Sequence, residues 1–101
     1  MAVTATMTLF RGAAATSTTT LYTTISGESK GVANIAITNT ATSAATATIN
    51  LGSAAVVSGI SIPANSTQLI DLAQVVSNGE TITASASTTG VNFHIAGYGI
   101  L

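Results

Sequence analysis

The chain has 101 residues, no cysteine and a formal net charge of −1, and only 5% of its residues are charged, against roughly 25% in an average soluble domain. This length supports one domain with a single modest core, and two cationic residues are too few to neutralise the phosphates of a nucleic acid. The absence of cysteine excludes a disulfide framework and a thiolate metal site.

The low charge is the most unusual property of the sequence. With so few ions, the surface must consist largely of Thr, Ser, Ala, Asn and Gly, and a surface of this kind associates readily. We therefore predict an assembly component, a homo-oligomer much of whose surface is covered in its working state. The charged residues are Arg11, Glu28, Lys30, Asp71 and Glu80.

The N-terminal segment alternates between apolar residues and threonine. Residues 4–10 predict a strand, with Val3, Ala5, Met7 and Leu9 on one face. Because these residues do not form an apolar block behind a Lys or Arg, we expect a strand and not a signal peptide. Apolar runs elsewhere are far shorter than the roughly 20 residues that cross a bilayer, so we predict no membrane association.

A threonine-rich run follows at residues 16–25. Here we expect Leu21 and Ile25 to reach the core while Tyr22 and Thr24 face away. Two interpretations of residues 1–20 stay open, an edge strand of the domain or an arm lying on a neighbouring subunit. Residues 21–101 are predicted to form the β-sandwich domain itself.

Residues 32–51 are the centre of the predicted fold. Ala33, Ile35 and Ile37 share one face, and the alternation restarts at residues 45–51 after a polar corner. We interpret the two runs as a hairpin with one apolar face. A lone hairpin is at best marginally stable in water, so further strands must cover that face.

The C-terminal half supplies these strands, separated by turns. Residues 55–62 predict a strand in which Gly59 marks a bulge or a close backbone approach, and a proline turn and a short strand at residues 67–72 follow. Residues 73–80 are expected to loop back through Asn78 and Gly79. The last two strands are predicted at residues 81–87 and 91–101, with inward faces formed by Ile82, Ala84, Ala86, Val91, Phe93 and Ile95.

No segment shows helical spacing over three turns, and β-branched residues dominate the predicted strands. Seven or eight short strands at regular spacing predict an all-β fold, a small antiparallel β-sandwich of immunoglobulin-like or jelly-roll type.

Side chains able to carry chemistry are few. His94 is the only histidine, and Glu28 and Glu80 are expected in separate turns. No sequence pattern marks a serine as the nucleophile of a triad with His94 and Asp71, and the acids lack the spacing of a zinc or calcium site. We predict no catalytic, cofactor-binding or metal-binding residues, and no enzymatic activity. His94 is expected on the outer side of the last strand beside Tyr98.

The remaining aromatic and threonine patterns have simple structural interpretations. Tyr22, Tyr98 and Phe93 are too few for a convincing ligand platform, and we expect them to pack in the core or in interfaces. The Thr-x-Thr pairs at residues 4–6 and 46–48 are interpreted as exposed strand positions and not as a lattice-binding array.

Two stretches of the chain carry a recognisable order of motifs. The first joins Leu21-Tyr22-Thr23, the turn at Gly27, Ile35-Ala36-Ile37-Thr38-Asn39-Thr40 and Ala45-Thr46-Ala47-Thr48-Ile49-Asn50-Leu51. The second joins Ile62-Pro63, Leu69-Ile70-Asp71-Leu72, Asn78-Gly79-Glu80-Thr81-Ile82, Ala84-Ser85-Ala86-Ser87 and Val91-Asn92-Phe93 with Gly97. Their order and spacing resemble the small β-sandwich virion proteins of tailed bacteriophages. Residues 1–20 are unmatched, and Ser26 stands where family members often have Pro.

The resemblance implies an immunoglobulin-like, non-enzymatic structural protein of a phage particle. It favours a capsid decoration or cement protein, made in the host cytoplasm, that bridges capsid subunits on the outer surface of the virion. Its partners would be the major capsid protein and other copies of itself, with no nucleic acid, membrane, small-molecule substrate or cofactor. Two alternatives stay open: a tail, baseplate or head-fibre protein, and a carbohydrate-binding module that uses Tyr22 and Tyr98.

Overall fold

The computed structural model describes residues 3–100, and the side chains described are those of residues 7–32, 34–71 and 74–99. The predicted inward faces of Val3, Ala5 and Ala33, and residue 101 of the last predicted strand, lie outside this description. The described chain contains eight strands: β1 (Val3–Ala13), β2 (Thr19–Thr23), β3 (Ser29–Asn39), β4 (Ala45–Leu51), β5 (Ala54–Ile62), β6 (Ser66–Ser77), β7 (Thr81–Ala86) and β8 (Val91–Ile100).

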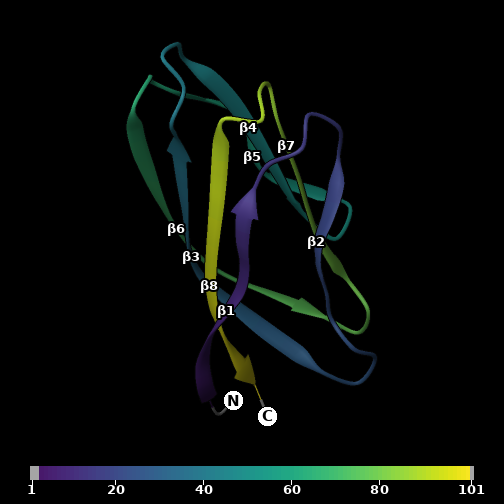
Figure 1. Cartoon of the computed structure of the whole chain (residues 1–101). Helices are drawn as coiled ribbons and strands as arrows, with labels where there is room; N and C mark the ends of the chain where they lie inside the picture. Colours follow the sequence, from purple (N-terminus) through teal and green to yellow (C-terminus); the bar gives the residue numbers. More distant parts are fainter. Residues whose placement is uncertain (1–2, 101) are drawn as a thin grey trace.

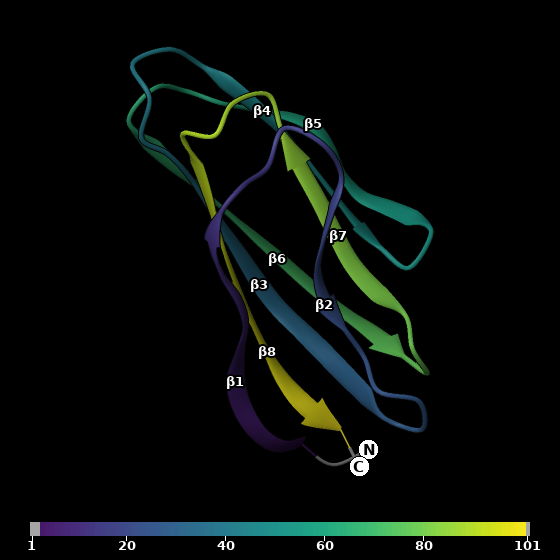
Figure 2. The ribbon, with the colours of Figure 1, turned by 45° about the vertical axis from the view of Figure 1, so that its right-hand side comes forward.

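The strands form two four-stranded antiparallel sheets that face each other (Figures 1 and 2). Sheet A has the order β1-β8-β3-β6, and sheet B has the order β2-β7-β4-β5. The apolar positions of the alternating strands point into the space between the sheets and form one core. This confirms the predicted all-β antiparallel sandwich.

The strand order decides between the two predicted topologies. The first strand pairs with the last, β2 pairs with β7, β3 with β6 and β4 with β5. The pairs are therefore nested, as in a single long antiparallel hairpin that is folded into two layers. Pairing of β3 with β8 and of β4 with β7 then completes each sheet. Eight strands connected in this nested way form a jelly roll, and the immunoglobulin grouping of strands is not present.

The predicted central hairpin is wrong, because its two strands belong to different sheets. β3 lies in sheet A and β4 lies in sheet B, so residues 40–44 carry the chain from one layer to the other. The predicted facing is nevertheless correct where it is described, since Ile35, Ile37 and Ile49 are all fully buried in the shared core. Alternation identifies the buried face of a strand but does not identify its neighbour.

Asn39 holds this crossing in place. Its side chain is completely buried, and its Nδ2 donates to the carbonyl oxygens of Ser43 at 2.8 Å, Ile62 at 3.1 Å and Pro63 at 3.4 Å. Its Oδ1 accepts a hydrogen bond from the backbone N–H of Ala41 at 3.0 Å. One amide therefore connects the end of β3 to the corner that follows it and to the end of β5.

The prediction for residues 24 and 25 is also wrong. Thr24 is 1% exposed and Ile25 is 68% exposed, the reverse of what alternation from Leu21 indicates. A register shift between Thr20 and Tyr22 in the pairing with β7 changes which residues face inward. As a result Tyr22 packs against the core, and Ile25 lies in the turn before β3.

Two strands are longer than predicted, and one predicted turn and one predicted bulge are confirmed. β1 continues to Ala13, and β6 continues to Ser77 where the sequence indicated a loop from residue 73. Asn78 and Gly79 have positive φ angles of 49° and 82°, which suit a tight turn between strands. Gly59 has a φ of 60° and donates its N–H to Thr48 Oγ1 at 3.0 Å, which confirms the predicted bulge in β5.

Candidate interaction surfaces

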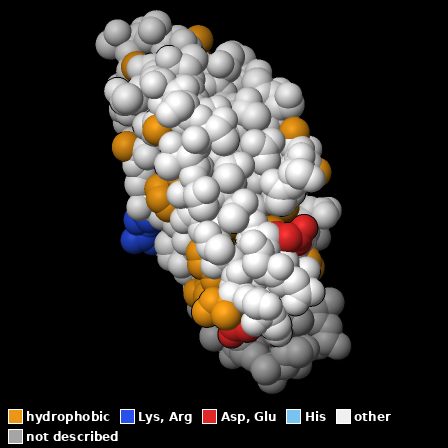
Figure 3. All heavy atoms as spheres, turned by 90° about the vertical axis from the view of Figure 1, so that its right-hand side faces the viewer, with side chains coloured by type: hydrophobic (Ala, Val, Ile, Leu, Met, Phe, Trp, Pro, Cys, Tyr) orange, Lys and Arg blue, Asp and Glu red, His pale blue; other side chains and the backbone are white. Residues whose placement is uncertain are grey.

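The outer side of sheet B is an array of uncharged polar side chains. The inward residues of β7 and β4 are Ile and Ala, and the residues between them point outward in register with neighbouring strands. We call the following outward residues the B face: Thr20, Thr23, Thr46, Thr48, Asn50, Ser61, Thr81, Thr83 and Ser85. None of these residues carries a charge. Figure 3, which views the molecule from the right-hand side of Figure 1, shows mostly white uncharged polar and backbone atoms, with orange hydrophobic patches, red acidic atoms at the right and lower centre, and blue at the left margin.

The spacing of the B face follows from strand geometry. Neighbouring strands lie about 4.8 Å apart, and side chains on one face repeat every two residues, about 6.7 Å. Asn50 stands opposite Thr83, and its Nδ2 donates to Thr83 Oγ1 at 3.2 Å. Thr48 accepts from Gly59 at the β5 bulge. These bonds hold part of the array in fixed positions, so the B face offers a partner an ordered surface of hydroxyl and amide groups.

The outer side of sheet A carries the single histidine. His94 stands opposite Arg11 in the pairing of β1 with β8, and Arg11 Nη2 lies 3.2 Å from His94 Nε2. A guanidinium group can only donate, so Nε2 accepts and the bonded imidazole carries its proton on Nδ1. Tyr98 lies further along β8 with its ring over Gly31 of β3. His94 is therefore on the outer side of the last strand, as the sequence indicates.

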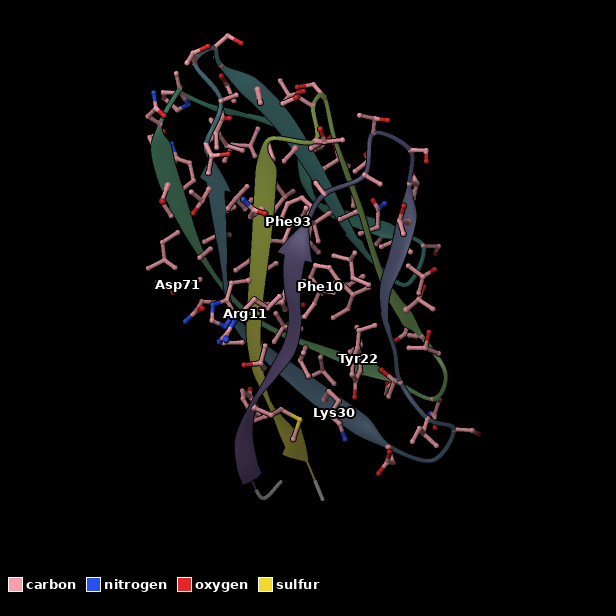
Figure 4. The ribbon with its side chains drawn as sticks, viewed as in Figure 1. Phe10, Arg11, Tyr22, Lys30, Asp71 and Phe93 are labelled. Carbon is pink, nitrogen blue, oxygen red and sulfur yellow. The ribbon has the colours of Figure 1, made fainter. Side chains whose placement is uncertain are left out.

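The remaining charged residues are spread over the molecule. Glu28 and Lys30 form an ion pair at 3.9 Å at the turn before β3, a pair of the kind that contributes about 0–1 kcal/mol. Glu80 Oε1 accepts from the N–H of Ser77 in the β6–β7 turn. Asp71 stands opposite Asn34, so β3 separates it from β8 and His94. Figure 4 shows Arg11 and Asp71 on the outer side and Phe93 between the sheets.

The aromatic residues do not share one surface. Phe93 is 1% exposed in the core, Tyr22 packs against the core from sheet B, and Tyr98 lies on the outer side of sheet A. Core packing is confirmed for Phe93. A sugar platform that needs Tyr22 and Tyr98 on one plane has no counterpart in this arrangement.

Other kinds of site are absent from the described residues. Among them no group of three or more acidic, histidine or cysteine side chains is placed to hold a metal ion, and these residues form no pocket. No helix in this part of the chain is long and apolar enough to span a bilayer.

No family model, curated protein or solved structure matches this chain. The β-sandwich is thus established by the structure, and the likeness to phage virion proteins stays a prediction. Sequence alternation predicts the outward positions of the threonines in β4 and β7 but does not predict the B face. The strands that place these side chains next to one another, β2-β7-β4-β5, are not consecutive in the sequence.

Proposed function

We propose that this chain is a non-enzymatic structural protein of a bacteriophage particle, a decoration protein that binds the outer surface of the capsid. The observation that carries the proposal is the B face, an ordered plane of hydroxyl and amide groups without charge. In this proposal the major capsid protein binds to the B face on the outer side of sheet B.

The physical argument concerns desolvation. Burying ions at an interface carries a penalty that their mutual attraction often fails to offset, and a standard interface buries roughly 1,600 Å² in total. Because the B face contains no ions, dehydrating it costs less than dehydrating an ordinary charged surface of that size. Hydroxyl and amide groups retain the ability to form specific hydrogen bonds with the partner.

The topology supports the same proposal by analogy. Jelly rolls occur in viral capsid domains and also in lectins and cupins, so fold alone does not choose among functions. The motif order that resembles phage virion proteins favours the first of these. A symmetric capsid offers many equivalent binding sites. Where neighbouring copies of this chain are linked to each other, their weak individual contacts with the capsid would combine into a higher overall avidity.

Copy number in purified particles tests the proposal. We expect one or a few copies for each capsid hexamer when the chain is quantified against the major capsid protein by mass spectrometry. A handful of copies in each particle, or antibody labelling confined to tails, would contradict capsid decoration and favour the tail, baseplate or head-fibre alternative. Glycan binding by the isolated chain that is lost in Tyr98→Ala would favour the carbohydrate-binding alternative.

A matched pair of variants tests the role of the B face. Thr46 and Asn92 are both exposed strand residues, but Thr46 belongs to the B face and Asn92 lies on the outer side of sheet A. Thr46→Lys puts an uncompensated cation into the proposed interface, so we expect incorporation into particles to fall by about tenfold or more. Asn92→Lys should be incorporated normally. Equal incorporation of both variants would contradict the assignment of the B face.

A further inference from the structure

Asn78 is the only asparagine of this chain that precedes a glycine, and the other asparagines are followed by Ile, Thr, Leu, Ser or Phe. The backbone nitrogen of a following residue can attack the amide carbon of an asparagine side chain, because the two groups are held close together within one molecule. A side chain on the following residue hinders this attack, and Gly79 has none. Asn78 and Gly79 are both exposed, so water reaches the pair.

The turn that contains this pair is a two-residue hairpin turn. The N–H of Glu80 donates to the carbonyl oxygen of Ser77 at 3.0 Å, and φ is 49° at Asn78 and 82° at Gly79. Two positive φ angles are typical of a type I′ turn. A type II′ turn keeps the positive φ of its first central residue and differs by a rotation of the peptide group between the two central residues. Glycine accepts φ of either sign, so this rotation is open to the peptide between Asn78 and Gly79.

The type II′ turn is the conformation in which a ring can close between these two residues. A planar five-membered ring through Cγ of Asn78 and the nitrogen of Gly79 requires Cβ and that nitrogen to lie on the same side of the Cα–C bond. For an L residue this occurs at a ψ of about −120°, the value of the first central residue of a type II′ turn. Among the described residues no acceptor binds the N–H of Gly79 and no donor binds the C=O of Asn78. The rotation therefore breaks no hydrogen bond of this peptide group.

We propose that Asn78 is a site of spontaneous deamidation. The nitrogen of Gly79 gives up its proton and forms a bond to Cγ, the bond from Cγ to Nδ2 breaks, and Nδ2 leaves as ammonia, so that a cyclic imide remains. Water then opens the imide. Cleavage at Cγ gives aspartate, and cleavage at the backbone carbonyl gives isoaspartate, in which the chain continues through the side chain. The net reaction consumes one water and releases one ammonia, and nothing is oxidised or reduced.

The reaction changes a connection between two turns. The N–H of Asn78 donates to the carbonyl oxygen of Glu28 at 3.0 Å, and Asn78 Oδ1 accepts from the N–H of Gly27 at 3.2 Å. Both products add one negative charge to a chain whose formal net charge is −1, two residues before Glu80. Isoaspartate also adds a carbon atom to the backbone within the turn. Deamidation therefore weakens the contact between the β6–β7 turn and the turn before β3.

Mass spectrometry of the folded chain, incubated at mildly alkaline pH, tests the proposal. We expect the side-chain amide of residue 78 to be replaced by a carboxyl group, with isoaspartate among the products. Asn65 is the matched internal control, because it is also exposed and has a φ of 53°, but it precedes Ser66. A short peptide of residues 75–82 sets the time scale. No product at residue 78 after the peptide has reacted completely, or an equal amount at residue 65, would overturn the proposal.

A destabilised variant tests whether the native turn is the species that reacts. Gly59→Ala changes β5, which is two strands away from β7 in sheet B, and it should raise the unfolded fraction about fivefold. The rate of deamidation at residue 78 should be unchanged in this variant, because rotation of one peptide group does not require unfolding. A rate that rises about fivefold, in step with the unfolded fraction measured by urea unfolding, would refute reaction in the native turn.

Discussion

Removal of the Asn39 side chain should be among the most damaging single changes in this protein. Asn39 is completely buried where the chain crosses between the sheets, and its amide forms three hydrogen bonds of 3.1 Å or shorter, to Ala41, Ser43 and Ile62. In Asn39→Ala the carbonyl oxygens of Ser43 and Ile62 lose a donor, and the N–H of Ala41 loses its acceptor.

The size of the effect follows from these bonds. A net contribution of about 1 kcal/mol for each hydrogen bond gives a loss of roughly 3 kcal/mol in the free energy of unfolding. For a domain of about 100 residues, 1 kcal/mol corresponds to about 4–8 °C in Tm, so Tm should fall by roughly 12–24 °C. Asn39→Asp keeps the size of the side chain but replaces the donor with an oxygen that faces the same carbonyl groups, and it should destabilise at least as much at pH 7.

Thermal and urea unfolding, followed by circular dichroism, measures both effects. Asn50→Ala is the control, because the Asn50 side chain is half-buried and donates a single hydrogen bond of 3.2 Å to Thr83. We expect that control to lose about 1 kcal/mol. If Asn39→Ala lost no more than Asn50→Ala, the inference that Asn39 fixes the crossing between the sheets would be refuted.

Two further predictions concern stability and use the same unfolding assay. The Oγ1 atom of Thr24 is buried without a hydrogen-bond partner, so Thr24→Val should stabilise the protein by about 1 kcal/mol, and a loss of stability would show that the hydroxyl has a favourable role. A Cβ atom at Gly97 would collide with the backbone oxygen of Gly31 and with Leu9 Cδ1 at 2.7 Å, so Gly97→Ala should cost about 3 kcal/mol. Gly59→Ala has open space but a φ of 60° and should cost only about 1 kcal/mol, so similar losses in the two glycine variants would contradict this steric explanation.

Period-two alternation was sufficient to predict much of the inward face. In β7 and β8 the predicted residues Ile82, Ala84, Phe93 and Ile95 are all buried at 2% or less, because these stretches contain no extra residue of their own: the shift opposite Ile82 and Thr83 adds its residue to β2. The prediction failed at Thr24, where a shift earlier in β2 reversed the facing. A bulge leaves little trace in sequence unless a glycine marks it, as Gly59 does in β5.

The candidate surfaces were predictable only in part. Threonines of β4 and β7 were placed outward from the sequence, and the array they form with β2 and β5 depends on pairings between distant segments. The C-terminal part of β6 was missed, because the sequence indicated a loop from residue 73 where the strand continues to Ser77. The hydrogen bond between Arg11 and His94 likewise joins residues 83 positions apart.

The sequence by itself determined the all-β class, the low charge and most of the inward faces, since these depend on composition and on local alternation. Only the tertiary structure decided which strands are neighbours, that β3 and β4 lie in different sheets, and that the fold is a jelly roll. The physical reason is that backbone hydrogen bonds between strands have the same chemistry for almost every residue. Partner choice is therefore settled by the packing of the whole core and by buried corner contacts such as those of Asn39.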